Sequence, residues 1–193
     1  MSPIIISAPK SLGKLEELIL CLAESASEIG ITKLEKLMYL CDFEAIKELG
    51  ESITGDTYRN FQWGPVPKHF IPAYENLLNE GRLEKREIRL KSGKDFTELR
   101  PRDKCSPQAF SDAEWAIINA VLKEHGNKNV AELVKLTHDE LTWKLTERNE
   151  EIPEFLAHYR AYKKPSAQDL AVLLEDPDYL NSVTRQLERR RSA

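Results

Sequence analysis

The stretch KLEKLMYLCDFEAIKELGESITGDTYRNFQWGPVP, residues 33–67, decides the fold of this 193-residue chain. Its first half predicts a helix that is apolar on most sides, with a main stripe formed by Leu34, Leu37, Met38, Cys41 and Ala45. Such a helix usually lies at the centre of a core. Residues 56–63 favour an extended strand because they are rich in aromatic residues. The Gly-Pro-Val-Pro run at 64–67 then predicts a break.

Helices are also predicted on both sides of this stretch. An apolar repeat at helical spacing predicts a first helix that ends at Gly30. The central helix is expected to open at Thr32, with Glu35 completing a capping box. Further helices are predicted at 69–80 and beginning near 111, 129, 166 and 177. Capping boxes are predicted at Ser111 with Glu114 and at Asn129 with Glu132.

Two charged segments, 82–90 and 95–101, flank a Lys-Ser-Gly-Lys turn and predict a β-hairpin. The predicted fold is therefore mainly α: a helical domain with a small β element, comprising a strand near 56–63 and a hairpin near 82–100. The order of its helices and hairpin is winged-helix-like. We assign residues 1–150 to this domain and 151–193 to a C-terminal helical extension, packed on the domain or specific to a partner. The acidic run at 147–154 is expected to be a solvated surface.

Composition gives a globular chain with a net charge of −4, so bulk electrostatics favour neither nucleic acid nor an anionic membrane. Its three cysteines form no C-x-x-C pair, and we expect them to be buried free thiols in a reducing cytosol. The N-terminal apolar patch is too short for a signal peptide, and no run approaches the length of a membrane span. We therefore expect a cytoplasmic protein without a membrane partner.

No catalytic, metal or cofactor site emerges from the motifs. The four histidines lack the spacing of a zinc site, and the chain has neither a nucleophile elbow nor a glycine-rich phosphate loop. Asp56 follows Gly55, where an aspartate commonly shapes a turn, although its place at the head of the strand leaves a functional role open. His138 and Trp143 are expected to cap and pack, with the histidine satisfied by a carbonyl or an acidic neighbour.

The quoted stretch resembles the signature of the Panacea domain, the family of SocA-like antitoxins that includes phage-associated relatives. The shared pattern comprises a K-L-x-K-L-x-Y-L-x-D-x-E helix at 33–44, I-T-G-D-x-Y at 53–58 and G-P-V-P at 64–67. Leu-Thr-His-Asp-Glu with Trp143 is similar to a second, looser motif of the family. The resemblance covers about residues 15–145, and the first motif is long enough to be specific.

The resemblance implies a non-catalytic antitoxin, which neutralises a toxin encoded by a neighbouring gene by binding it. Tyr, Trp and Arg dominate binding energy at interfaces, so the strand near 56–63 is a candidate aromatic platform. Arg59 is the preferred contact, whereas Trp63 is expected to fill the interior beside the Gly-Pro turn. The candidate motif and partner-binding residues are Asp42, Asp56, Tyr58, Arg59, Trp63, Pro65, His138 and Trp143.

A DNA-binding regulator of winged-helix type is the alternative hypothesis. It would use the cations of the 82–100 hairpin and the basic tail, which comprises Arg185 and residues 189–191. Salt separates the two hypotheses, because phosphate contacts weaken steeply with ionic strength while an apolar interface does not.

Overall fold

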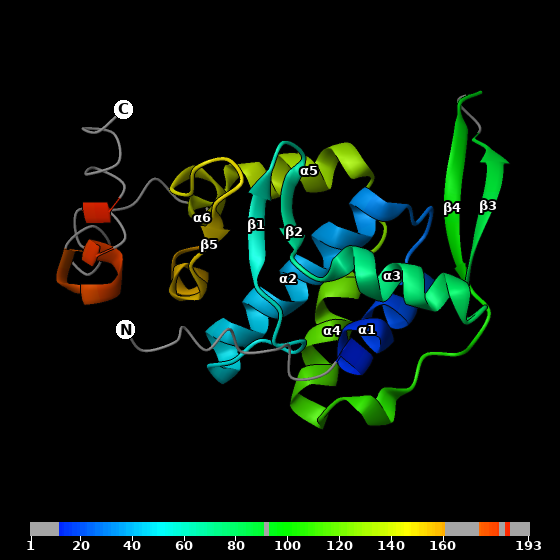
Figure 1. The fold of residues 1–193 in the computed structure, drawn as a ribbon, viewed down its shortest axis with the longest axis horizontal. Coiled ribbons are helices and arrows are strands. Elements are labelled where there is room, and N and C mark those ends of the chain that lie inside the picture. The colour runs from blue at the N-terminus through cyan, green and yellow to red at the C-terminus, as the bar shows by residue number, and fades with distance from the viewer. Residues whose placement is uncertain (1–11, 91–92, 161–173, 182–183, 186–193) are drawn as a thin grey trace.

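The computed structural model describes residues 12–90, 93–160, 174–181 and 184–185. The described fold is mainly α with a small β element, as predicted, and this element comprises a small antiparallel sheet and a separate hairpin. Helix α2 (Ile31–Leu49) runs through the middle and packs against α1 (Leu12–Ser25), α4 (Asp112–His125) and α5 (Val130–Asp139) (Figure 1). Helix α3 (Phe70–Asn79) lies on α1.

Burial confirms the central position of α2, because the side chains from Lys33 to Phe43 are all buried. The N-cap is Gly30, two residues before the predicted Thr32, and it makes no side-chain capping bond. Gly30 therefore does not end α1 as predicted, because α1 ends at Ser25. The predicted Thr32 capping box is therefore wrong: Thr32 already lies inside the helix, and Glu35 is buried beside Lys36. At the other end, Gly50 closes the helix with a left-handed φ of 84°.

The predicted break at 64–67 is also wrong. Strand β1 (Tyr58–Phe61) turns into β2 (Gly64–Pro67), and the two pair antiparallel from Tyr58 opposite Pro67 to Phe61 opposite Gly64. Proline is tolerated in β2 because this strand lies at the edge of its sheet. On the other side of β1 lies β5 (Glu151–Ile152), whose Ile152 is buried, so the acidic run at 147–154 is not simply a solvated surface.

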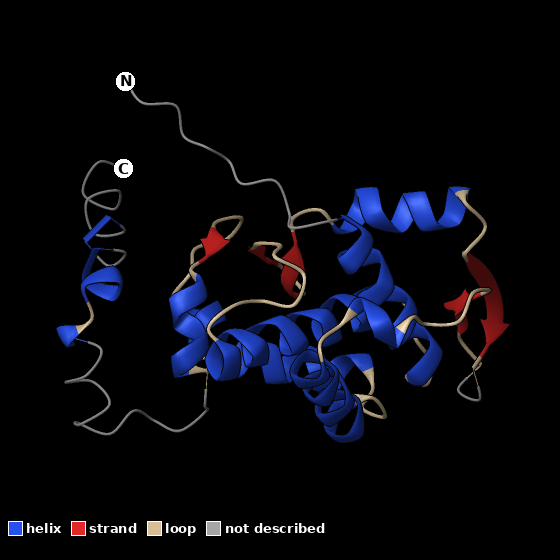
Figure 2. Cartoon of the chain, turned by 90° about the horizontal axis from the view of Figure 1, so that it is seen from below, coloured by secondary structure: helices blue, strands red, loops and turns tan. Residues whose placement is uncertain are grey.

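The predicted charged hairpin is confirmed as β3 (Leu83–Arg89) and β4 (Asp95–Pro101). It stands at one end of the molecule in both views (Figures 1 and 2). The capping boxes predicted at Ser111 and Asn129 are confirmed at the starts of α4 and α5. The other labelled elements are short α6 (Leu141–Lys144) and the 3-10 turns η1 (Pro107–Ala109) and η2 (Glu154–Tyr159). Residues 174–175, 177–181 and 184–185 are also helical. The resemblance to a winged helix stays a prediction.

The expectation that all three cysteines are free thiols is wrong. Cys21 of α1 and Cys105 form a disulfide, with their Cα atoms 4.6 Å apart, while Cys41 is free and buried. The bonded residues are 84 positions apart in sequence, and spacing alone did not indicate that the connector before α4 returns to α1. Main-chain amides of this connector also donate to Glu17 and Glu24 of α1, which brings the two thiols together.

Residues 151–160 pack on the helical domain through β5 and η2, whereas the predicted boundary at 150 stays a prediction. The helix predicted from 166 begins outside the described residues, as does the basic tail at 189–191. At the helix predicted from Pro177, Asp176 accepts hydrogen bonds from the amides of Asp178 and Tyr179, as a capping residue does. None of the described helices is both long and apolar enough to span a membrane.

Candidate docking site at the β1–β2 hairpin and helix α5

A row of polar side chains spaced three residues apart along α2 positions the candidate site. Lys33, Lys36, Tyr39 and Asp42 are all buried, and each binds a different segment of the chain. Lys33 Nζ donates to the Ser27 carbonyl at 2.6 Å. The other three reach the β1–β2 hairpin and the start of α6, as the next paragraphs describe.

Asp42 holds the loop before β1 and β1 itself. Its two carboxylate oxygens accept hydrogen bonds from the Thr54 amide at 2.9 Å, the Thr54 hydroxyl at 2.6 Å and the Tyr58 hydroxyl at 2.7 Å. Burial raises the pKa of Asp42 to about 6, although these hydrogen bonds act in the opposite direction. Asp42 and Tyr58 therefore fix the hairpin from inside the core.

Asp56 also has a structural position, in agreement with the predicted turn. It is 2% exposed and accepts hydrogen bonds from the amides of Thr57 and His69, both at 2.9 Å. Its Oδ1 lies 2.7 Å from His69 Nδ1. Asp56 thus joins the entry of β1 to the start of α3.

Lys36 lies directly beneath the turn into β2. Its ammonium donates to the Pro65 carbonyl at 2.6 Å and lies 3.6 Å from the Glu35 carboxylate. Burial lowers the pKa of Lys36 to about 8, against the opposing effect of Glu35. Pro65 is buried, so this candidate residue positions the turn and does not present a surface.

A second buried cluster joins α2 to the segments on either side of β5. The Tyr39 hydroxyl donates to Glu140 at 2.5 Å, and Arg160 binds the same carboxylate at 3.1 Å. Arg160 also lies 3.3 Å from Glu44. Sequence reasoning missed Glu140 and Arg160 because they lie about a hundred residues from their partners on α2. The one available signal was the hydroxyl of Tyr39, which needs a hydrogen-bond partner because it lies on a helix predicted to be buried.

The outer face of the hairpin carries exposed apolar and basic side chains. Arg59 and Phe61 alternate with buried Tyr58 and Asn60 along β1. Trp63, at the tip, is 60% exposed. The expectation that Trp63 fills the interior is therefore wrong, because β2 continues the hairpin and leaves the tip projecting.

Beside Trp63 lies an apolar hollow of about 620 Å³ on the outer side of α5. Its walls are formed by Trp63, Val130, Ala131, Val134, Lys135, His138 and Asp139. Lys135 has no ion-pair partner among the described residues, whereas Asp139 lies 3.7 Å from Lys144. The free charge at the rim is therefore positive.

His138 and Trp143 stack with their ring centroids 4.0 Å apart. The expected partner of His138 is not found among the described residues: its Nε2 is buried without a hydrogen bond. Burial, with the nearby Lys36 charge, lowers the pKa of His138. The Trp143 indole donates to the Phe61 carbonyl at 3.4 Å, so it braces the hairpin from behind.

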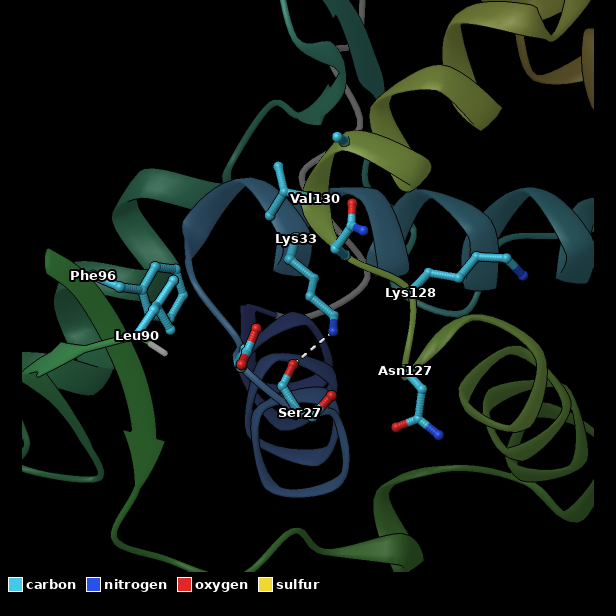
Figure 3. A pocket seen from close by; sticks show the side chains of 10 residues that line it. Ser27, Lys33, Leu90, Phe96, Asn127, Lys128 and Val130 are labelled. Carbon is cyan, nitrogen blue, oxygen red and sulfur yellow. Dashed lines mark hydrogen bonds between the residues drawn. The ribbon is translucent and has the colours of Figure 1, made fainter. Parts of the chain in front are cut away.

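A second hollow, of about 290 Å³, lies at the N-terminal end of α5 (Figure 3). Val130 and Ala131 line both hollows, so the two adjoin at the start of α5. Lys33 lies in the middle of this second hollow and is held by Ser27, while Phe96 and Leu90 of the β3–β4 hairpin close its far side.

The arrangement is suited to binding a side chain or a helix of another protein. Over the described ranges, no group of three or more His, Cys, Asp or Glu side chains is placed to hold a metal ion. The polar clusters around Asp42 and Glu140 lie inside the core, where they order the backbone. The apolar hollow and the free Lys135 face outward.

A family model described as "Antitoxin SocA-like, Panacea domain" matches residues 34–144, which is more than half of the chain. The matched region begins inside α2 and ends with α6, so it includes the buried polar row from Lys36 onward and both walls of the 620 Å³ hollow. Among curated proteins and among solved structures, nothing matches the chain.

Proposed function

Because the chain belongs to the family of SocA-like antitoxins with a Panacea domain, we propose that it neutralises a protein toxin by direct binding, without catalysis of its own. The toxin would be the product of a neighbouring gene. The observation that supports this proposal most is the exposed Trp63 beside the apolar hollow of α5.

Trp63 is placed as an anchor for a partner. Tryptophan is among the residues that contribute most to binding energy at interfaces, and 60% of this side chain is accessible. The hairpin that carries Trp63 is fixed by Lys36 under Pro65 and by Asp42 on Tyr58. A partner would therefore bind a surface that is already ordered, which lowers the entropic cost of association.

The hairpin also indicates how the partner binds. The outer edge of β2 contains Pro65 and Pro67, which have no amide to donate, so a strand of the toxin would not extend this edge readily. Recognition by side chains is favoured instead. We expect the toxin to place an apolar side chain in the hollow beside Trp63 and an acidic group near Lys135.

The test is co-expression with each neighbouring gene product, followed by growth assay and copurification. A neighbour that kills alone, is silenced by this chain and elutes with it identifies the toxin. In that complex, Trp63→Ala is expected to weaken binding about 30-fold, the effect of losing about 2 kcal/mol at an interface anchor. Arg59→Ala is expected to weaken binding less, because this side chain lies on the hairpin away from the hollow.

The matched control is Leu49→Ala, since Leu49 is also an exposed apolar residue, at 42%, but lies at the far end of α2. It should bind the toxin as wild type does. A Trp63→Ala variant that folds and still binds with wild-type affinity would place the toxin on another surface. If no neighbour is toxic and none copurifies, the antitoxin proposal itself fails for this chain.

A further inference from the structure

The β3–β4 hairpin distributes its ion pairs unevenly. Close to the body of the molecule, its arginines are all held by acids within 3.1 Å: Arg82 by Glu17 and Asp103, Arg100 by Glu98, and Arg102 by Glu84. In the distal half, Arg86, Arg89 and Lys94 are exposed and have no ion-pair partner among the described residues. The distal half therefore presents cations that the protein itself does not neutralise.

Acidic residues compensate these cations only in part. Glu87 is engaged by the Thr97 hydroxyl at 2.7 Å, and Asp95 lies opposite Arg89 in the strand register. Across residues 82–104 the sequence has nine basic and five acidic residues, a net charge of +4. Since the whole chain carries −4, the rest of it carries −8. A polyanion would therefore be attracted to this hairpin and repelled by most of the remaining surface.

The shape of the hairpin agrees with one class of polyanion. Each strand has seven residues and spans about 24 Å, and the pair stands at one end of the molecule (Figures 1 and 2). A two-stranded ribbon of this kind fits the major groove of B-form DNA, which is about 12 Å wide. We propose that the distal half of the β3–β4 hairpin binds duplex DNA, with Arg86, Arg89 and Lys94 on backbone phosphates.

An acidic protein surface is the rival partner, and the composition of the hairpin argues against it. Stable protein interfaces need apolar or aromatic anchors at their centre, whereas contacts with phosphates do not. The large apolar residues that the described structure exposes are Ile31, Leu49, Phe61, Trp63, Ile71, Leu174 and Leu180, and none lies on this hairpin. Its exposed positions are instead mainly charged.

The DNA site is separate from the proposed toxin surface and does not depend on it. The experiment is fluorescence anisotropy of a labelled 24-base-pair duplex of mixed sequence, titrated with the full chain between 50 and 200 mM KCl. We expect a Kd on the order of 10 µM at 50 mM KCl, which is typical of binding without sequence preference. The triple variant R86E/R89E/K94E should lose at least tenfold in affinity. Loss of three phosphate contacts should also reduce the slope of log K against log salt by about 2.7.

The matched control is K68E/K123E/R148E, which makes the same charge change at three exposed residues outside the hairpin and should stay within threefold of wild type. The neutral variant R86Q/R89Q/K94Q is a control for a folding defect caused by the added acids, which thermal melts would reveal. It should also lose at least tenfold in affinity for the duplex. Absence of binding by the wild type at 50 mM KCl would overturn the proposal. So would equal losses in the hairpin and control variants, or a hairpin variant that binds as tightly as wild type.

Discussion

Gly64 shows how closely the hairpin is fitted to the core at a single residue. Its φ is 101°, and a Cβ there would lie 2.8 Å from the Thr137 hydroxyl and 2.9 Å from Lys36 Cε. We expect Gly64→Ala to lower the free energy of unfolding by about 2–3 kcal/mol, because it adds a steric clash to the cost of a left-handed backbone. Urea unfolding followed by circular dichroism measures the change.

Gly50 provides the matched control for this prediction. It has a similar φ of 84°, but a Cβ built there meets nothing within 4 Å. Gly50→Ala should therefore lower the free energy of unfolding only by the cost of a left-handed backbone, about 1 kcal/mol. Equal losses in the two variants would mean that the contacts of Gly64 with Thr137 and Lys36 do not constrain the hairpin.

Lys36 makes stability depend on pH in a defined direction. Burial lowers its pKa to about 8 in the folded state, whereas the unfolded chain keeps the ordinary value of 10.5. Between these values the unfolded state binds more protons, so stability increases as the pH rises and falls as the pH drops through 8. From pH 7 to 9 we expect the free energy of unfolding to increase by about 1 kcal/mol from this residue.

The measurement is urea unfolding of wild type and Lys36→Met across that range. The Cys41 thiol ionises near this range only in the unfolded chain, because burial raises its pKa in the folded state, so it acts in the opposite direction. Subtracting the profile of Lys36→Met from that of the wild type cancels this contribution. A difference that stays constant from pH 7 to 9 would show that the Lys36 ammonium is not desolvated as the structure indicates.

Individual residues also show where sequence reasoning succeeds and where it stops. Arg59, the preferred contact, is exposed in the structure and lies with Phe61 on one face of β1, because a strand has a period of two. Trp63 was placed wrongly because the rule that aromatic residues beside Gly-Pro turns anchor loops fails here, where β2 continues the hairpin and leaves its tip projecting. The missing partner of His138 is a tertiary property that no local pattern indicates.

At the scale of elements, the sequence contained a signal that could have been found. Lys33, Lys36, Tyr39 and Asp42 recur every three residues inside an apolar helix, and buried polar groups of this kind need partners. The partners themselves were not predictable. Glu140 lies 101 residues after Tyr39, and Tyr58 reaches Asp42 only because β1 folds back along α2.

Arg160 tests whether the segment after β5 is integral to the fold. Glu140 is 5% exposed, and Arg160 is its cationic partner in the buried cluster with Tyr39. Arg160→Met should lower the free energy of unfolding by about 3 kcal/mol, because it leaves a buried carboxylate unpaired. The double variant E140Q/R160M should recover part of this loss, which urea unfolding of all four proteins would measure as a coupling energy.

Arg100→Met serves as the comparison for Arg160→Met. Arg100 pairs with Glu98 at 2.6 Å, but half of its side chain is exposed on the β3–β4 hairpin. Exposed pairs contribute little, so this variant should cost less than about 1 kcal/mol. Similar losses for the two arginines would argue that the cluster around Glu140 contributes no more than a surface ion pair.

For the whole molecule, the class of fold was predictable from the sequence, but the contacts that join distant segments of the chain were not. Apolar periodicity, capping boxes and turn residues indicated the main helices and the charged hairpin, because these features depend on neighbours within a few residues. The Cys21–Cys105 disulfide and the pairing of β5 with β1 join segments 84 and about 90 residues apart. Contacts between segments so far apart are fixed by packing and produce no periodic pattern in the sequence.

The extent of the folding unit follows from these long-range contacts. The family match ends at residue 144, yet Ile152 is buried beside β1 and Arg160 closes the cluster on α2. A chain ending at residue 162 should therefore keep the stability of the full chain to within about 1 kcal/mol, since among the described residues it loses only contacts such as those of Tyr159 with Asp176 and of Phe155 with Tyr179.

A chain ending at residue 150 lacks both β5 and Arg160, so it exposes Tyr58 and leaves Glu140 without its cation. We expect it to lose at least 3 kcal/mol and to melt cooperatively only at a lower temperature, if it folds at all. Urea and thermal unfolding of the three chains decide the question. Equal stability of the chains ending at 150 and 162 would move the edge of the domain back to the predicted boundary, because residues 151–160 would then contribute nothing to the core.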